Sequence, residues 1–257
     1  MESSIVIFEG TKEEGIFSTA KKFYPENYTE KDIYNEVKKS RIKLGKKHNF
    51  SGLKMLQVTQ KMEDNDLYED NKYEIITEKH LQKKDYFLEK ILADILIITN
   101  KYKGVALCHR TGDCPIIIAE DRKKKVSAII HCNLYHINRE LPKEMIKVLI
   151  KEFKSKSEDI YLYIGSHIKK ENYIYDNYPI KATNKRIWKN AIEEKNNKYY
   201  IDMERAIRDQ LKEFKLGGIE VSKIDTAVDK RYASHRMTYL GDDSKKGQNI
   251  VGFYYKV

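Results

Sequence analysis

Residues 108–136 decide the fold and read CHRTGDCPIIIAEDRKKKVSAIIHCNLYH. Two apolar runs within this stretch, residues 115–119 and 126–131, are rich in isoleucine and valine and flank a polar turn at residues 120–125. Apolar runs on either side of a short polar turn are typical of a β-hairpin. The stretch therefore predicts a strand, a tight turn and a second strand.

The predicted hairpin places a thiol beside an imidazole. If the turn is centred between Arg122 and Lys123, Cys114 lies directly opposite His131. Directly opposed residues of an antiparallel pair hold their Cβ atoms about 4.5 to 5.5 Å apart, which lets an imidazole reach a sulfur. Such a pair can form a nucleophile with its base, or supply two ligands to a catalytic zinc. Core packing of a buried cysteine against a histidine is the alternative without chemistry.

Length and composition limit the class of protein. The chain has 257 residues, of which 40% are hydrophobic, and neither a linker nor a repeat divides it, so we expect one domain over residues 1–257. We find no apolar run of about 18 residues and no basic segment before an apolar one at the start. We therefore expect no membrane span, no signal peptide and a cytoplasmic location. The three cysteines, an odd number, then favour reduced thiols.

The net charge of +10 at pH 7 raises the question of nucleic-acid binding, because clustered lysine and arginine bind phosphates. The lysines are instead scattered among acidic residues, and no aromatic-plus-basic motif of an RNA-binding sheet occurs. The charge predicts a solvated lysine-rich surface and no specific nucleic-acid partner.

The rest of the chain mixes strands and helices. A helix capped by Thr29 is expected to end near Gly45, a second helix covers residues 141–153, and a third runs from Asp202 to residue 216. A further helix is expected at residues 85–92, and Trp188 is expected to lie in the core. Further strands are expected at residues 5–8, 53–58, 93–99, 105–108, 159–165, 220–227 and 250–256. Because hairpins join several strands, a mixed sheet in an α/β or α+β fold is predicted rather than a doubly wound parallel sheet.

Residues 93–131 resemble the multicopper polyphenol oxidoreductase or laccase-domain family, whose members are also described as purine nucleoside phosphorylases. That family shows T-A-D-C after a Gly-Val strand and H-A-G-W-R-G after an alanine-rich strand. The residues that match are Thr111, Asp113, Cys114 and His131. The segment Y-A-S-H-R at residues 232–236 resembles the F-Y-S-H-R motif of the family, and residues 159–168 resemble its strand that ends in G-P-x-I.

The resemblance implies two packed mixed β-sheets flanked by helices, and an enzyme whose ligands are a purine nucleoside and phosphate. The implied reactions are metal-dependent phosphorolysis of the N-glycosidic bond and, as a related activity, adenosine deamination. Cys114 and His131 would bind zinc or copper and act in catalysis together with Asp113. The residues implied to bind substrate are His167, Ser234, His235 and Arg236, with Arg236 as the cation near phosphate.

The sequence departs from the family pattern at three motifs. The first metal-binding histidine of the family, in Q-V-H-G, corresponds to Thr59, the arginine of H-A-G-W-R-G corresponds to Tyr135, and the closing G-R reads Gly247 and Gln248. Because each lost donor weakens metal binding, we expect zinc or copper to be held weakly or to be absent, and activity to be altered or weakened. The candidates for a replacement ligand are Cys132, His136, His167 and His235.

Two other functions fit the same residues. In a metal-free Cys-His hydrolase or deamidase, like the cytotoxic necrotizing factor toxins of similar fold, Cys114 would be the nucleophile and His131 its base. Alternatively, the chain is a non-catalytic protein that binds a purine or a partner. Thr59 and Tyr135 favour the non-catalytic function, whereas Cys114 and His131 favour an enzyme.

Overall fold

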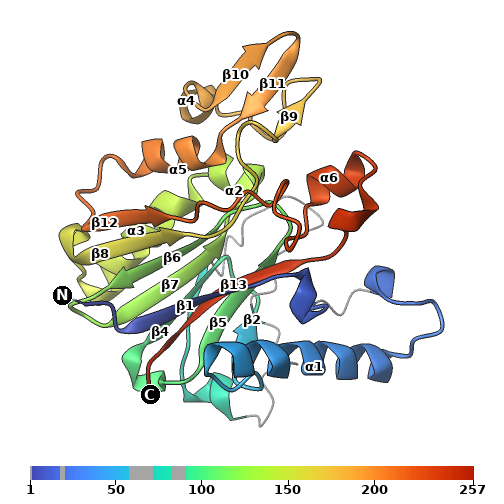
Figure 1. Cartoon of the computed structure of the whole chain (residues 1–257). Coiled ribbons are helices and arrows are strands. Elements are labelled where there is room, and N and C mark those ends of the chain that lie inside the picture. Colours follow the sequence, from blue (N-terminus) through green and yellow to red (C-terminus); the bar gives the residue numbers. More distant parts are fainter. Residues whose placement is uncertain (1, 18–20, 58–71, 83–90) are drawn as a thin grey trace.

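Two β-sheets pack against each other, and helices cover their outer faces (Figure 1). The structure is a computed structural model that describes residues 2–17, 21–57, 72–82 and 91–257. This arrangement confirms the predicted mixed α/β fold of two packed sheets flanked by helices.

The first sheet has four strands in the order β1-β13-β5-β2. The strands are β1 (Ile5–Gly10), β13 (Asn249–Tyr255), β5 (Ala106–Thr111) and β2 (Met55–Gln57). β13 pairs antiparallel with β1 and β5, whereas β2 pairs parallel with β5, so the sheet is mixed.

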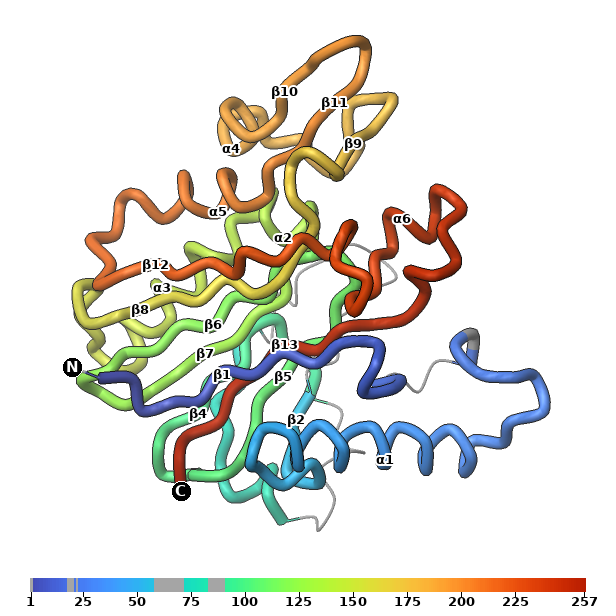
Figure 2. Tube along the Cα trace, in the orientation of Figure 1, coloured from blue at the N-terminus to red at the C-terminus, as the bar shows by residue number. Residues whose placement is uncertain are grey.

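The second sheet has six strands in the order β12-β8-β6-β7-β4-β3. The strands are β12 (Gly218–Val221), β8 (Ile160–Ile164), β6 (Ile116–Asp121), β7 (Val126–His131), β4 (Ile95–Thr99) and β3 (Tyr73–Ile75). The β12–β8 and β3–β4 pairs are parallel and the others antiparallel. A small third sheet, which the sequence did not predict, projects beyond the other two in Figure 2. Its strands are β9 (Ile174–Tyr175), β10 (Ile192–Lys195) and β11 (Lys198–Ile201).

The core forms because each central strand is apolar on both faces. In β4, Leu96 and Ile98 pack with Leu107 of β5 between the two sheets, and Ile95 and Ile97 pack towards the helices on the other side. Burying each such side chain contributes about 1.5 to 3 kcal/mol. The interface between the sheets is therefore the main apolar contact that holds them together.

The helices cover the outer faces of the sheets. The second sheet packs against α2 (Leu134–Asn138), α3 (Leu141–Phe153) and α5 (Met203–Leu211), and the first sheet against α1 (Glu30–His48). The remaining α-helices are α4 (Lys185–Trp188) and α6 (His235–Tyr239). Single 3₁₀ turns cover Lys12–Glu14, Lys21–Phe23, Glu78–Leu81, Asn100–Tyr102, Ser157–Asp159 and Asp243–Lys245. Among the described helices, none combines the length and the apolarity that a membrane span requires.

Helix α1 begins where the sequence predicts and ends later. The Thr29 side chain accepts a hydrogen bond from Asp32 N, which confirms the predicted cap. The helix continues past Gly45 to His48, and Asn49 ends it in a left-handed conformation with φ 60°. Gly45 serves close packing instead, since a Cβ there would lie 2.5 Å from the Phe50 carbonyl oxygen.

The hairpin has the predicted strands, but its register is shifted by two residues. Ile116, not Cys114, pairs with His131, so the predicted direct pairing of Cys114 with His131 is wrong. The shift arises because the turn covers residues 122–125, while Glu120 and Asp121 belong to strand β6. Glu120 Oε1 accepts hydrogen bonds from the backbone N–H and the hydroxyl of Ser4, and this contact keeps the buried carboxylate in the strand.

Other predicted elements differ mainly at their ends. Helix α3 has the predicted bounds, and Asp202 caps α5 by accepting a hydrogen bond from Arg205 N. Helix α5 stops at Leu211, before the predicted end at residue 216, and β12 begins at Gly218. Trp188 is 1% exposed, which confirms its place in the core. The helix predicted at residues 85–92 falls almost entirely outside the described residues.

Candidate functional site

A group of histidines lies at one end of the interface between the sheets. His131 is the last residue of β7 and alternates with Ile129, which packs between the sheets. His109 occupies the corresponding face of β5, because it alternates with Leu107. The His109 and His131 ring centroids are 6.1 Å apart, and His136 of α2 lies 5.9 Å from His131. The fold thus gathers three imidazoles from two strands and a helix.

These imidazoles are uncharged at neutral pH. Burial is the main cause that lowers their pKa values, to about 3 for His109 and about 4 for His136. The pKa of His131 is lowered well below its usual value by burial, and then by the neighbouring His136 and His109. Neutral imidazoles are the form that accepts protons or binds metals.

Cys114 lies in the loop that joins β5 to β6. The Thr111 hydroxyl donates a 2.6 Å hydrogen bond to the Cys114 carbonyl, and this contact holds the loop. Burial and the Asp113 carboxylate raise the pKa of the Cys114 thiol to about 12, against an opposing effect of Lys181. These surroundings keep the sulfur protonated at neutral pH unless a ligand displaces the proton.

Asp113 anchors this loop to the C-terminal part of the chain. Its Oδ1 accepts a 2.7 Å hydrogen bond from the Thr226 hydroxyl, and its Oδ2 accepts a 2.6 Å hydrogen bond from Arg236 N at the start of α6. The side chain is buried. Both carboxylate oxygens are thus occupied, an arrangement that suits positioning of Cys114 and α6.

The three residues of the C-terminal motif lie at the start of α6. Ser234 is the N-cap and accepts a hydrogen bond from Met237 N. The exposed His235 lies against Gly112, where an added Cβ would come within 2.6 Å of its ring. The Arg236 guanidinium stacks over the Tyr175 ring at 4.4 Å and donates to the Ile174 carbonyl. The Arg236 side chain therefore holds helix α6 against strand β9, beside the loop that carries Asp113.

His167 is committed to other partners. It is 1% exposed, its Nδ1 is 2.8 Å from the Gly165 carbonyl oxygen, and its Nε2 is 3.1 Å from the Lys169 ammonium. Burial, with the charge of Lys169, lowers the pKa of His167 to about 4. This geometry leaves neither ring nitrogen for a metal or a substrate.

Sequence reasoning missed three residues at the site. The strand predicted at residues 105–108 continues in the structure to Thr111. With the longer strand, the alternation of side chains would have placed His109 on the face towards the second sheet. Burial raises the pKa of Tyr173, and the neighbouring Cys114 raises it further. The charge of Lys181 lowers the pKa values of Cys114 and His136. Tyr173 and Lys181 therefore both lie close to the thiol. Neither residue belongs to a motif that could have identified it.

The donors implied by the family pattern do not complete a metal site in the described chain. Cys114 and His131 are two donors, and the position of the third, Thr59, lies outside the described residues. In residues 2–17, 21–57, 72–82 and 91–257, no group of three or more His, Cys, Asp or Glu side chains could hold a metal ion. Two buried imidazole nitrogens of the histidine group nevertheless lack a hydrogen-bond partner among the described residues, Nε2 of His109 and Nδ1 of His136.

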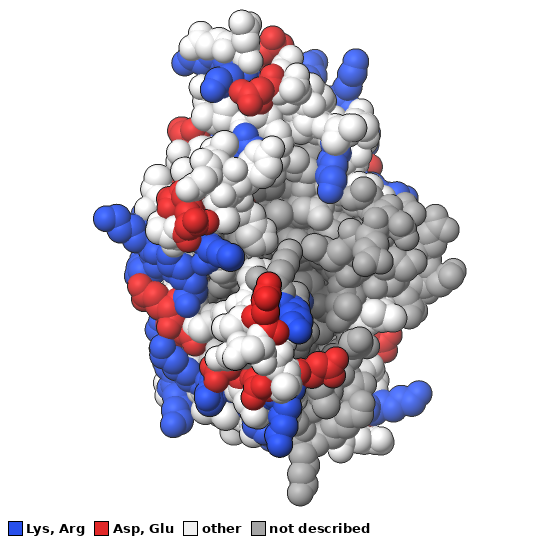
Figure 3. All heavy atoms as spheres, turned by 90° about the vertical axis from the view of Figure 1, so that its right-hand side faces the viewer, with Lys and Arg blue, Asp and Glu red and all other residues white. Residues whose placement is uncertain are grey.

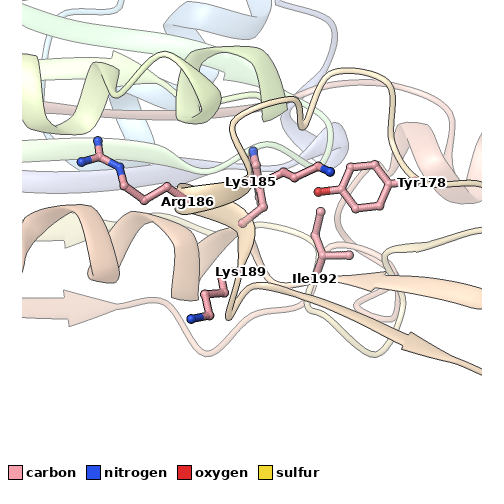
Figure 4. A pocket seen from close by; sticks show the side chains of 6 residues that line it. Tyr178, Lys185, Arg186, Lys189 and Ile192 are labelled. Atoms are coloured by element: carbon pink, nitrogen blue, oxygen red, sulfur yellow. The ribbon is translucent and has the colours of Figure 1, made fainter.

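A hollow of about 470 Å³ lies away from these residues, beside α4 and β10 (Figure 4). It is lined by Tyr178, Lys185, Arg186, Trp188, Lys189 and Ile192. Arg186 also pairs with Glu140 at 3.1 Å, and no buried charged group faces the hollow from among its described lining residues. On another face of the molecule, acidic and basic side chains lie interspersed over the described surface (Figure 3). We therefore place the candidate site at Cys114 and the histidines.

Comparison with known proteins gives the same class of fold. The model of the family described as multi-copper polyphenol oxidoreductase laccase matches residues 11–252, so the chain belongs to this family. Bacillus licheniformis hypothetical protein YfiH is 19% identical with a TM-score of 0.68, over 86% of this chain and 82% of that one. YlmD from Geobacillus stearothermophilus is 17% identical with a TM-score of 0.69, over 87% and 81%. A search of curated proteins gives no match.

Proposed function

We propose that the chain cleaves the N-glycosidic bond of a purine nucleoside with phosphate, at the site around Cys114 and His131, with activity altered from that of its family. The observation that carries this proposal is a pair of cations beside the retained motif residues. Arg236 stacks on Tyr175, and Lys181 lies close enough to Cys114 to act on its pKa. A phosphate needs such cations, and arginine suits it best because its donors match two phosphate oxygens.

The Arg236 guanidinium has a donor to spare. One of its Nη atoms donates to the Ile174 carbonyl, whereas its buried Nε lacks a hydrogen-bond partner in the described part of the chain. A buried donor without a partner costs about 1 to 3 kcal/mol. A phosphate oxygen bound at Nε would remove that cost. The unpaired Nε of Arg236 therefore favours the binding of an anion.

In the proposed reaction, a phosphate oxygen attacks C1′ of the ribose and the bond from C1′ to N9 breaks. The electron pair of that bond leaves with the purine, and the proton of hydrogen phosphate ends on the base, so the products are the free base and ribose 1-phosphate. The neutral His131 imidazole has one donor and one acceptor nitrogen and can pass this proton. Arg236 and Lys181 hold the phosphate and stabilise its charge.

A metal-free Cys-His hydrolase receives less support from the site. Such enzymes depend on a thiolate whose pKa is lowered by an imidazolium. Here burial raises the pKa of Cys114 and lowers that of His131, so both groups favour their neutral forms. Adenosine deamination remains a second reaction to be measured in the same assay.

The test is incubation of the purified chain with inosine or adenosine, with and without phosphate, followed by chromatography of bases and sugar phosphates. We expect free base and ribose 1-phosphate only when phosphate is present. Arg236→Gln should lower kcat/KM for phosphate by roughly 10- to 100-fold, because a hydrogen bond to a charged group contributes about 1.5 to 3 kcal/mol.

Arg231→Gln is the matched control, since this exposed arginine pairs with Asp229 outside the site. It should leave turnover unchanged. Base release that does not require phosphate would point to hydrolysis instead, and inosine formed from adenosine would point to deamination. If neither nucleoside is converted, the proposed activity is refuted and a non-catalytic binding function becomes the better explanation.

A further inference from the structure

We propose that Arg41 of α1 and Arg110 of β5 form a binding site for a phosphate group, on the face of the first sheet that α1 covers. The source of that group is either free inorganic phosphate or a nucleotide. The proposed reaction assigns its own phosphate to Arg236 and Lys181, so this site uses other residues and the inference goes beyond the proposed function.

The pairing of β2 with β5 brings the two guanidinium groups to one place. Arg41 donates from Nη1 to the Met55 carbonyl oxygen and from Nη2 to Gln57 Oε1, both at 3.2 Å. Gln57 pairs with Cys108 in the parallel ladder of β2 and β5. Arg110 is the next residue of β5 whose side chain lies on the same face as Cys108. The Arg41 guanidinium therefore lies beside β5, next to the position of Arg110.

The partner of Arg110 on β13 shows which face of the sheet this is. Ile250 pairs directly with Arg110, so the two side chains share a face. Ile250 packs with Leu44 of α1 and with Cys108 in one apolar cluster. Arg110 is partly exposed, whereas Arg41 is 3% exposed. A ligand can therefore reach Arg110 from solvent, and Arg41 adds a second, buried charge.

The charges of these two side chains act on a common neighbour and on each other. Burial raises the pKa of the Cys108 thiol to about 11, against the opposing charges of Arg41 and Arg110. Burial, and then the charge of Arg41, lowers the pKa of Arg110. The thiol stays protonated near neutral pH and adds no negative charge. Two like charges in a partly buried place are unfavourable unless an anion accompanies them.

Arg110 has no carboxylate partner in the described part of the chain. Its guanidinium makes neither a hydrogen bond nor an ion pair with any residue in the ranges 2–17, 21–57, 72–82 and 91–257. Other arginines pair with carboxylates, namely Arg122, Arg186, Arg205, Arg208 and Arg231. Because burying a charge without a partner is costly, an anionic ligand at Arg110 would be stabilising.

The chemistry of the site suits a phosphate group. Tyr24 lies close enough to Arg110 for the arginine charge to act on its pKa, which burial and then Glu36 raise to about 12. The phenol is therefore protonated and can donate a hydrogen bond. Arginine donors match two oxygens of a phosphate, and two guanidinium groups balance the nearly two negative charges that a phosphate group carries at pH 7.

The charge of Arg110 also reaches the candidate site. After burial and the neighbouring histidines, it contributes to the lowered pKa values of His109 and His131. His109 precedes Arg110 on β5 and faces the second sheet. This proximity is the reason to test a nucleotide, because its sugar would lie at the histidines while its phosphate binds Arg110.

The first test is isothermal titration calorimetry of the intact chain with inorganic phosphate, AMP and adenosine. Arg110→Gln should weaken binding of the phosphate group at least tenfold, because it removes hydrogen bonds between charged groups. Arg110→Lys keeps the charge without the paired donors and should weaken binding less. Arg205→Gln is the matched control, since this arginine pairs with Asp209 on α5, and it should bind both ligands like the wild type.

The three ligands distinguish the two sources of phosphate. AMP that binds more tightly than both phosphate and adenosine, with the advantage lost in Arg110→Gln, would identify a nucleotide site. Equal affinities for phosphate and AMP, both reduced in Arg110→Gln, would identify free phosphate as the ligand. The Arg236→Gln variant should keep the binding that depends on Arg110, which separates this site from the phosphate of the proposed reaction.

A crystal of the wild-type chain with tungstate gives a readout that needs no substitution. Tungstate is a tetrahedral dianion that anomalous scattering locates, and we expect it between Arg41 and Arg110. Tungstate bound only elsewhere, a wild-type chain that binds neither phosphate nor AMP, or unchanged affinities in Arg110→Gln would each overturn the proposal. Because these experiments measure binding, a chain that converts no nucleoside can still confirm the site, and a missing site does not contradict the proposed reaction.

Discussion

Asp113 illustrates how one side chain joins distant parts of the chain. Asp113→Ala would leave the Arg236 backbone N–H and the Thr226 hydroxyl without their acceptor in a buried place. Because each hydrogen bond to a charged group contributes about 1.5 to 3 kcal/mol, we expect the free energy of unfolding to fall by about 3 kcal/mol or more. Urea denaturation followed by circular dichroism measures the change.

The matched control for this substitution is Asp176→Ala, which removes a carboxylate that is 80% exposed and 3.8 Å from Lys198. Exposed ion pairs contribute about 0 to 1 kcal/mol, so the control should unfold almost like the wild type. Equal stabilities for the two variants would contradict the anchoring role of Asp113.

Individual residues differ in how well the sequence reveals them. Cys114 and His131 could be singled out because they lie in motifs, and the structure places them at the same end of the sheets. His109 could be found only with the correct length of β5, whose last residues are polar and do not look like a strand. Lys181 reaches the site from a loop far along the chain, and no local pattern encodes that approach.

The turn between β6 and β7 holds a residue in an unfavourable conformation. Lys125 has φ 54°, and the Asp121 side chain accepts hydrogen bonds from Lys123 N and Lys124 N around the same turn. The left-handed conformation costs a residue with a Cβ atom about 1 kcal/mol or more in conformational free energy, whereas glycine adopts it without this cost. We expect Lys125→Gly to raise the free energy of unfolding by about 0.5 kcal/mol, after the greater flexibility of unfolded glycine is counted.

Lys124→Gly tests the same substitution at the adjacent position, where φ is not positive. Lys124→Gly should lower the free energy of unfolding by several tenths of a kcal/mol, because glycine raises the conformational entropy of the unfolded chain and relieves no strain here. The opposite signs of the two changes, read from thermal unfolding midpoints, are the expected result. Two decreases would mean that Lys125 makes stabilising contacts through its side chain.

Elements set by local chemistry are the ones that sequence patterns predict well. The caps at Thr29 and Asp202 depend on residues within one turn, and both form as expected. The hairpin register follows from a turn at residues 122–125, and the hydrogen bonds that the distant Ser4 donates to Glu120 of β6 have no counterpart in the local pattern. The same limit applies to β10, which has no buried residue and therefore no apolar alternation to detect.

At the scale of the whole molecule, the fluorescence of Trp188 can show whether the chain unfolds as one unit. It is the only tryptophan, and its indole N–H donates to Asn138 Oδ1 across the contact of α4 with α2. If the chain is one domain, tryptophan fluorescence and far-ultraviolet circular dichroism should give the same urea midpoint. An earlier fluorescence transition would indicate that the part around the third sheet unfolds separately, against the single-domain prediction.

The packed layers of the molecule were predicted from a family resemblance, because hydrophobic patterns alone do not say which strands become neighbours. Patterns gave apolar strands and amphipathic helices, and hairpins limited the choice to mixed sheets. They could not place β13 between β1 and β5, since that pairing joins segments from opposite ends of the sequence.

This central place of β13 has a consequence for synthesis on the ribosome. Strands β1 and β5 pair through β13 and not with each other, so the four-stranded sheet stays incomplete until residues 249–255 have been made. Until then β1 and β5 present unpaired backbone edges, which invite association with other chains. His109 lies on β5, so the candidate site is also incomplete until β13 has been made. Nascent chains that stall before that point should need chaperones to prevent aggregation.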